Sequence, residues 1–175
     1  MKFIDTATIK LKAGKGGDGA ICFRREKYVP KGGPNGGNGG HGAGIYFVGD
    51  KSRHTLMDFR YKSIYKAEEK GKGSDMHGKS GEDLVLPVPL GTIIRNATTG
   101  EIIPDITKDE EKILVAKGGR GGRGNMCFAT PEQRAPRYAE DGKDGEELEV
   151  ELELKLLADV GIIGFPNAGK STFIS

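Results

Sequence analysis

The chain has 175 residues, of which 29 are glycine and only 35% are hydrophobic, so its apolar core must be small for its length. No apolar stretch approaches the roughly 20 residues that span a membrane, and the first residues lack the apolar run of a signal peptide. We therefore expect a soluble, cytoplasmic protein with no membrane partner. Cys22 and Cys127 have neither metal-type spacing nor a secretory context, and we interpret both as small buried hydrophobes.

The net charge of +2 conceals a division along the chain. Residues 1–138 carry 24 Lys or Arg and 16 Asp or Glu, a net of +8, whereas residues 139–175 carry 3 and 9, a net of −6. Clustered bases favour a polyanionic partner, because each phosphate that is neutralised releases counterions. A solvated face that keeps the protein soluble is the alternative. The bases that we expect to contact nucleic acid are Arg24, Arg25, Lys27, Lys31, Arg120, Arg123, Arg134 and Arg137.

Several segments have the pattern of β-strands. Residues 3–12 alternate, with Ile9 and Leu11 on one face and lysines on the other. The clearest strand is predicted at residues 147–156, where leucine or valine alternates strictly with glutamate or lysine. Shorter β-type runs occupy residues 93–95, 101–103 and 113–115.

Glycine dominates two tracts. Twelve glycines lie between Gly14 and Gly44, and five more lie between Gly118 and Gly124. Hydrophobic groups at residues 20–23, 44–47 and 125–128 follow the tracts and indicate an internal repeat. Such density suits extended left-handed helices that approach closely because no Cβ intervenes. Disorder is the alternative, although the apolar anchors argue against it.

A phosphate-binding loop begins at Gly164. The segment Gly164-Phe165-Pro166-Asn167-Ala168-Gly169-Lys170-Ser171 satisfies the spacing G-x-x-x-x-G-K-[ST]. Backbone N–H groups of this loop can surround phosphate oxygens, Lys170 can reach the β- and γ-phosphates, and Ser171 can ligate Mg²⁺. An apolar run at residues 156–163 precedes the loop as a buried strand would, and residues 171–174 would open the helix that follows.

Phosphoryl transfer needs further elements: a second strand with a metal-organising Asp, a segment that positions water, and a base-recognition loop. None of these appears before Ser175. We therefore expect a complete N-terminal domain followed by the first strand and loop of a nucleotide-binding domain, and we expect this stretch alone not to hydrolyse nucleotide. No Ser/His/Asp, Cys/His or paired-carboxylate constellation suggests that the N-terminal domain is itself an enzyme.

Several long motifs in the same order resemble the Obg (CgtA) family of bacterial GTPases, and the resemblance covers the whole chain. They are the glycine-rich tracts, residues 23–34 (FRREKYVPKGGP), residues 118–125 (GGRGGRGN), and the junction at residues 156–161 (LLADVG) that leads into the phosphate-binding loop. Together these motifs are far more specific than the loop alone, which many unrelated NTPases share.

The resemblance implies a mainly β fold in which a small β-barrel carries projecting glycine-rich helices of the polyproline-II type. This Obg domain would occupy residues 1–157, and residues 158–175 would begin an α/β Ras-like G domain. The resemblance also implies GTP or GDP as the ligand, with Gly164 to Ser171 around the phosphates and Ser171 on Mg²⁺. The other motifs of the G domain have no counterpart in this chain.

Members of the family act with guanine nucleotides on the large ribosomal subunit, in its assembly and in stress response. The resemblance thus implies that the basic glycine-rich domain docks on ribosomal RNA, and that the parent protein is a GTPase. The alternative is a protein-interaction platform for stress-response or other regulatory partners. Tyr28 and Tyr138 lie beside the bases, where they could stack on unpaired RNA bases or serve loop packing. A monomer is the default expectation.

Overall fold

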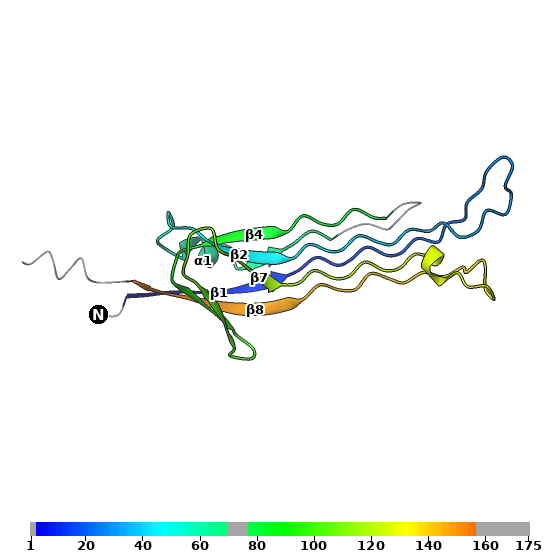
Figure 1. Ribbon diagram of the computed structural model, residues 1–175. Helices are drawn as coiled ribbons and strands as arrows, with labels where there is room; N and C mark the ends of the chain where they lie inside the picture. Colours follow the sequence, from blue (N-terminus) through cyan, green and yellow to red (C-terminus); the bar gives the residue numbers. More distant parts are fainter. Residues whose placement is uncertain (1–2, 70–76, 157–175) are drawn as a thin grey trace, which may run out of the picture.

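The computed structural model describes residues 3–69 and 77–156, and in these ranges the fold is mainly β, as predicted (Figure 1). One short α-helix and one 3₁₀ helix accompany the strands there. The elements in chain order are β1 (Phe3–Lys12), β2 (Ile45–Gly49), α1 (Met57–Tyr61), β3 (Ile64–Lys66), β4 (Leu84–Val88), β5 (Thr92–Asn96), β6 (Ile102–Ile106), β7 (Lys112–Ala116), the 3₁₀ helix (Asn125–Phe128) and β8 (Glu147–Leu156).

The two longest strands, β1 and β8, form the centre of the larger sheet. They pair antiparallel over ten residues, from Phe3 opposite Leu156 to Lys12 opposite Glu147. The strand order of this sheet is β3-β1-β8-β5-β6. The alternation predicted for residues 147–156 is confirmed, because Val150 and Leu152 are fully buried while Glu147 is exposed.

The smaller sheet has the order β4-β2-β7, with β2 parallel to β4 and antiparallel to β7. The inner faces of the two sheets share one hydrophobic cluster, in which Phe47 of β2 and Ile9 of β1 are completely buried. The predicted strands at residues 3–12, 93–95 and 113–115 lie within β1, β5 and β7, and the run at residues 101–103 overlaps the start of β6.

Helix α1 was not predicted from the sequence. It is only five residues long, and tertiary contacts hold it in place. The buried carboxylate of Asp5 accepts hydrogen bonds from Leu56 N (2.6 Å) and Thr55 Oγ1 (2.8 Å) just before the helix. Phe59 packs edge-on against Phe47, with ring centroids 6.3 Å apart. A helix of this length is unstable on its own, and for that reason the local sequence does not predict it.

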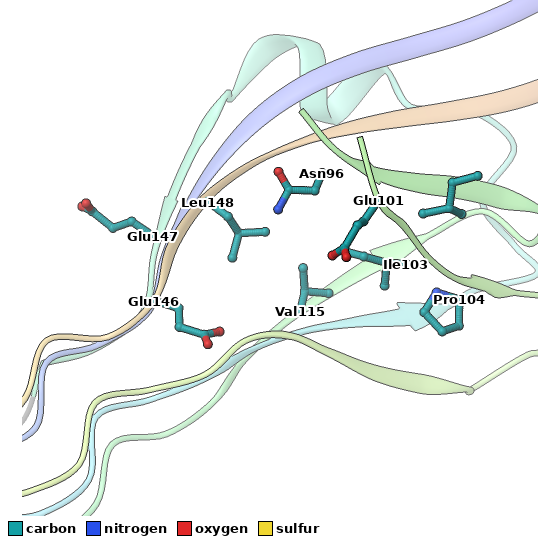
Figure 2. Close-up of a pocket in the computed structure, with 9 residues that line it drawn as sticks. Asn96, Glu101, Ile103, Pro104, Val115, Glu146, Glu147 and Leu148 are labelled. Atoms are coloured by element: carbon teal, nitrogen blue, oxygen red, sulfur yellow. The ribbon is translucent and has the colours of Figure 1, made fainter. Parts of the chain in front are cut away.

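The small β-barrel that the resemblance implies is not confirmed, because the described strands form two separate sheets and no closed barrel. Strand β6 ends one sheet and β7 ends the other, and no backbone ladder joins them. A pocket of about 760 Å³ opens instead along this seam, and Figure 2 shows Leu148, Val115 and Ile103 around it. We call it the seam pocket; its lining residues are Asn96, Glu101, Ile102, Ile103, Pro104, Val115, Glu146, Glu147 and Leu148.

Extended segments project from one end of the sheets and run side by side (Figure 1). We call four of them arm 1 (residues 13–20), arm 2 (residues 36–43), arm 3 (residues 117–124) and arm 4 (residues 139–146). A fifth segment accompanies arm 2, where Gly78 N and Gly81 N donate to the carbonyls of Asn38 and His41, each at 2.8 Å.

The arms are joined by backbone hydrogen bonds that recur every third residue. Arms 1, 2 and 3 close a cycle, in which each arm donates to the next at 2.8–3.0 Å. Arm 4 completes a second cycle with arms 1 and 3 at 2.8–3.0 Å. The donor and acceptor pairs of the first cycle are Gly14–Ala43, Gly17–Gly40 and Ala20–Gly37, then Gly39–Gly122 and Gly42–Gly119, then Gly119–Gly14 and Gly122–Gly17.

Close approach of the arms explains the glycine content. A Cβ atom on Gly39 would lie 1.8 Å from Gly17 O, and one on Gly121 would lie 1.9 Å from Gly39 O. Such separations are far inside van der Waals contact, so only glycine permits the observed backbone spacing. The tracts are therefore ordered by each other, and disorder, the alternative considered from sequence, does not describe them.

Candidate nucleic-acid interface

The predicted phosphate-binding residues, Gly164 to Ser171, lie outside the described residues, as do residues 157–163 of the strand predicted to precede them. The structure therefore places only the predicted RNA contacts. Within residues 3–69 and 77–156, no three His, Cys, Asp or Glu residues are grouped so that they could hold a metal ion. No helix in those ranges is long and apolar enough to cross a membrane.

Two loops lie at the far end of the arms (Figure 1). Tip loop 1 (residues 21–35) connects arm 1 to arm 2, and tip loop 2 (residues 125–138) connects arm 3 to arm 4. Tip loop 1 folds back on itself, because Arg24 N donates to Gly33 O (3.0 Å) and Asn35 N donates to Cys22 O (2.8 Å). Tip loop 2 begins with the 3₁₀ helix.

One buried side chain, that of Asn125, ties the two tip loops together. Its Oδ1 accepts hydrogen bonds from Gly36 N (2.8 Å) and Cys22 N (3.4 Å). Its Nδ2 donates to Cys22 O (3.0 Å) and to Pro136 O (3.1 Å). Both the oxygen and the nitrogen of the side-chain amide are therefore hydrogen-bonded, and the side chain is completely buried. No sequence pattern pointed to this role, since a Gly-Asn pair ordinarily signals only a turn.

All eight predicted RNA-contacting bases are exposed. Arg24, Arg25, Lys27 and Lys31 lie on tip loop 1, and Arg134 and Arg137 lie on tip loop 2. Arg120 and Arg123 belong to arm 3, just before the tip. The structure thus brings bases that are about a hundred residues apart in sequence to one end of the projection.

Some of these bases already have partners within the protein. Arg24 forms a salt bridge with Glu26 at 2.6 Å. Arg123 donates to both carboxylate oxygens of Glu140 on arm 4, from Nε at 3.0 Å and from Nη2 at 2.7 Å. By contrast, Arg25, Lys31 and Arg137 form no salt bridge with another described residue. The unpaired bases are the better candidates for contacts with a partner, and Arg123 serves first to join two arms.

The Arg123–Glu140 pair predicts a pH dependence of stability. Hydrogen bonds from the Arg123 guanidinium lower the pKa of Glu140 from 4.5 to about 2. Because the pKa of Glu140 is lower in the folded state than in the unfolded state, the Arg123–Glu140 pair stabilises the fold fully when the pH is above the pKa of the unfolded state. This stabilisation is lost as the pH falls through the pKa of the folded state. We expect the difference in unfolding free energy between the native chain and Glu140→Gln to be constant above pH 5 and to shrink between pH 4.5 and 2. Urea titrations at several pH values would measure it, and a constant difference at every pH would contradict it.

Aromatic rings accompany the bases on tip loop 2. The rings of Phe128 and Tyr138 are 4.9 Å apart, and the Arg123 guanidinium lies 4.8 Å from the centroid of Phe128. Tyr138 therefore takes part in loop packing, although nearly half of its surface remains exposed. Tyr28 on tip loop 1 is 85% exposed, and Lys27 Nζ lies 5.6 Å from the centroid of its ring. Of the two tyrosines, Tyr28 is the one whose ring is open to a stacking partner.

Two interpretations of the sequence need correction. Cys127 is exposed and not buried, with its thiol 3.2 Å from Asn38 Oδ1, and Cys22 is only half-buried. The three hydrophobic groups interpreted as a repeat also have different surroundings. Residues 45–47 belong to β2 in the core, whereas residues 21–23 and 126–128 lie at the tips. Burial depends on which end of an arm a group occupies, and the local sequence does not carry that information.

These features together define a β protein whose hydrogen-bonded, glycine-rich projection carries two basic loops at its end. The family model described as GTP1/OBG matches residues 4–156. The chain belongs to this family, which confirms the resemblance seen in the sequence.

Curated relatives agree with this assignment. The chain is 59% identical to proteins named GTPase Obg from Persephonella marina and Aquifex aeolicus, with 100% and 99% of this chain covered. It is 58% identical to a GTPase Obg from Streptococcus suis, with 99% covered. These alignments cover 52%, 51% and 40% of the respective relatives. The chain thus spans about half the length, or less, of the curated relatives that it matches.

Proposed function

We propose that the chain is the N-terminal part of a GTPase that binds GTP or GDP with Mg²⁺. An Obg domain at residues 1–157 would precede a G domain that begins at residue 158. Gly164 to Ser171 would hold the phosphates, with Lys170 neutralising their charge and Ser171 ligating Mg²⁺. The spacing of the loop supports this, as do the names of the relatives. Hydrolysis would belong to the longer protein and not to these residues alone.

We further propose that the arms are polyproline-II helices and that the tips dock on ribosomal RNA of the large subunit. The three-residue period of the hydrogen bonds supports the first point, because polyproline-II has three residues per turn. An eight-residue arm of this kind would be roughly 25 Å long at about 3.1 Å per residue. Such a stiff arm can enter a cleft between RNA helices that a globular surface cannot reach. The proposed setting is cytoplasmic, in subunit assembly and stress response.

The observation that carries RNA docking is the set of unpaired bases on two loops that a buried amide holds together. RNA is recognised largely through backbone phosphates and shape, which suits exposed Arg and Lys on a rigid support. Acidic side chains are few on the tips, and Glu26 is already paired with Arg24. Tyr28 adds an exposed ring that can stack on an unpaired base.

The test is co-sedimentation of the chain with purified large and small ribosomal subunits across a salt series. We expect selective pelleting with the large subunit that weakens as salt rises. The double variant Arg25→Glu with Arg137→Glu should lower the affinity at least about tenfold. It should also reduce the slope of log affinity against log salt concentration by about 1 for each phosphate that the variant no longer neutralises. Lys62→Glu with Lys108→Glu, which changes the same charge at exposed positions away from the tips, is the matched control and should bind as the native chain does.

Equal weakening in the tip variant and the control would contradict docking through the tips, because it would reflect net charge alone. If the amount of protein that pellets is the same at every salt concentration and in both double variants, a protein partner for this domain would be favoured. Neither result would bear on nucleotide binding by the phosphate-binding loop.

A further inference from the structure

The seam pocket has features that neither nucleotide binding nor docking through the tips uses. Its floor is apolar, since Ile103, Val115 and Leu148 are partly buried hydrophobic residues packed against the core. Ile102 at its margin is 60% exposed. At about 760 Å³, the pocket is large enough for at least one aliphatic side chain and the backbone that carries it.

The charge of the pocket is opposite to that of the tips. Its lining includes three carboxylates and no lysine or arginine. Glu147 pairs with Lys12 at 3.5 Å and points away from the other lining residues in Figure 2, whereas the side chains of Glu101 and Glu146 point toward them. Glu146 is exposed, and its Oε2 accepts a hydrogen bond from Lys117 N (2.8 Å), whereas its Oε1 has no hydrogen bond or ion pair with another described residue. This rim repels phosphate and attracts Lys or Arg.

The pocket also lies beside an unoccupied strand edge. Strand β7 pairs with β2 on one side, and no described strand pairs with its other side. Strand β6, across the pocket, contains Pro104, which has no N–H to donate and so makes β6 a poor partner for another strand. An extended segment entering the seam would therefore align with β7 and place alternate side chains in the pocket.

We propose that the seam pocket binds an extended, basic segment of a partner protein. One large aliphatic side chain of that segment sits against Ile103, Val115 and Leu148. The flanking Lys or Arg residues pair with Glu101 and Glu146. Nucleic acid does not fit the carboxylate rim, so this surface complements the basic tips with a second kind of partner. The proposal depends neither on RNA docking nor on nucleotide.

The probe is a synthetic seven-residue peptide that alternates lysine with leucine, titrated into the native chain. We expect saturable binding, with chemical-shift changes concentrated on the methyl groups of Ile103, Val115 and Leu148. Replacing the central leucine of the peptide by serine should abolish the changes, because the apolar floor then has no side chain to bury. A peptide with glutamate in place of lysine should not bind.

The charge of the rim is tested with the double variant Glu101→Gln and Glu146→Gln. A glutamine at position 146 can still accept the hydrogen bond from Lys117 N, so the fold is kept. We expect binding to weaken about tenfold, which is about 1.4 kcal/mol. Glu82→Gln with Glu132→Gln, which removes the same charge from exposed positions outside the lining, is the control and should bind normally.

Three results would overturn the proposal. The first is equal binding by the rim variant and the control. The second is a set of peptide-induced shifts that lies on the tips or on the outer face of β8 and not on the pocket methyl groups. The third is a shift of those methyl groups with protein concentration alone, because the occupant would then be a second copy of this chain.

Discussion

Replacing Gly16 by alanine is expected to unfold the projection while leaving the two sheets folded. A Cβ atom there would lie 2.2 Å from Arg120 O and 2.4 Å from Arg120 C, so arms 1 and 3 would have to separate. Separation would strain the hydrogen bonds between Gly119 N and Gly14 O and between Gly122 N and Gly17 O, which close the cycle. We expect stability to fall by about 3 kcal/mol or more, comparable with severe overpacking of a core.

The effect should be local because the arms contain few apolar side chains, whereas the hydrophobic cluster lies between the sheets. Amide hydrogen exchange measures this directly. Protection should disappear at Gly17, Gly39 and Gly122 and persist in β1 and β8. Lys15→Ala is the matched control, since Lys15 is exposed and adjoins Gly16, and its effect should stay within about 0.5 kcal/mol. Retained protection at Gly39 in the Gly16→Ala variant would contradict the close packing of the arms.

The features that could be anticipated from sequence are those whose cause is local. Strand β8 was predictable because strict alternation of Leu or Val with Glu fits only a strand with one buried face. The glycine-rich arms were expected to lie close together because residues without Cβ permit it. The bases of the tips were correctly expected on the surface. In each of these cases the chemistry of the residues themselves determines the local structure or the exposure, without reference to distant contacts.

Features that depend on contacts distant in sequence were not predictable. Helix α1 exists because Asp5, about fifty residues earlier, accepts hydrogen bonds at its start. Arg123 was expected to contact RNA, but in the structure its guanidinium donates to the carboxylate of Glu140 and so joins two arms. The barrel was expected from the family resemblance. Closing a barrel requires β6 to pair with β7, and the residue patterns of the two strands do not show whether they pair. The phosphate-binding loop stays a prediction, because it lies outside the described residues.

Replacing Asn125 by alanine is expected to separate the two tip loops and to weaken the proposed docking on RNA. The change removes the acceptor of Gly36 N and the donor to Cys22 O and Pro136 O, all within a buried site. Cys22 O keeps the hydrogen bond from Asn35 N, so Gly36 N and Pro136 O are the two buried groups that lose the partner supplied by this side chain. At about 1–3 kcal/mol for each such group, a total of roughly 2–6 kcal/mol is expected. Thermal unfolding and hydrogen exchange at Gly36 would measure the destabilisation. Met126→Ala, at the exposed neighbouring position, is the control.

The variant Asn125→Asp separates the two halves of this role. It keeps an oxygen for Gly36 N but faces the carbonyls of Cys22 and Pro136 with a carboxylate, which cannot donate to them. We expect it to be at least as destabilising as alanine at neutral pH, because a buried charge is added to the missing donors. Both variants retain every base of the tips. If both variants pellet with the large subunit as the native chain does, the relative position of the two loops does not matter for docking. If pelleting falls about tenfold or more while the sheets remain folded, the buried amide acts by holding the bases of the tip loops in place.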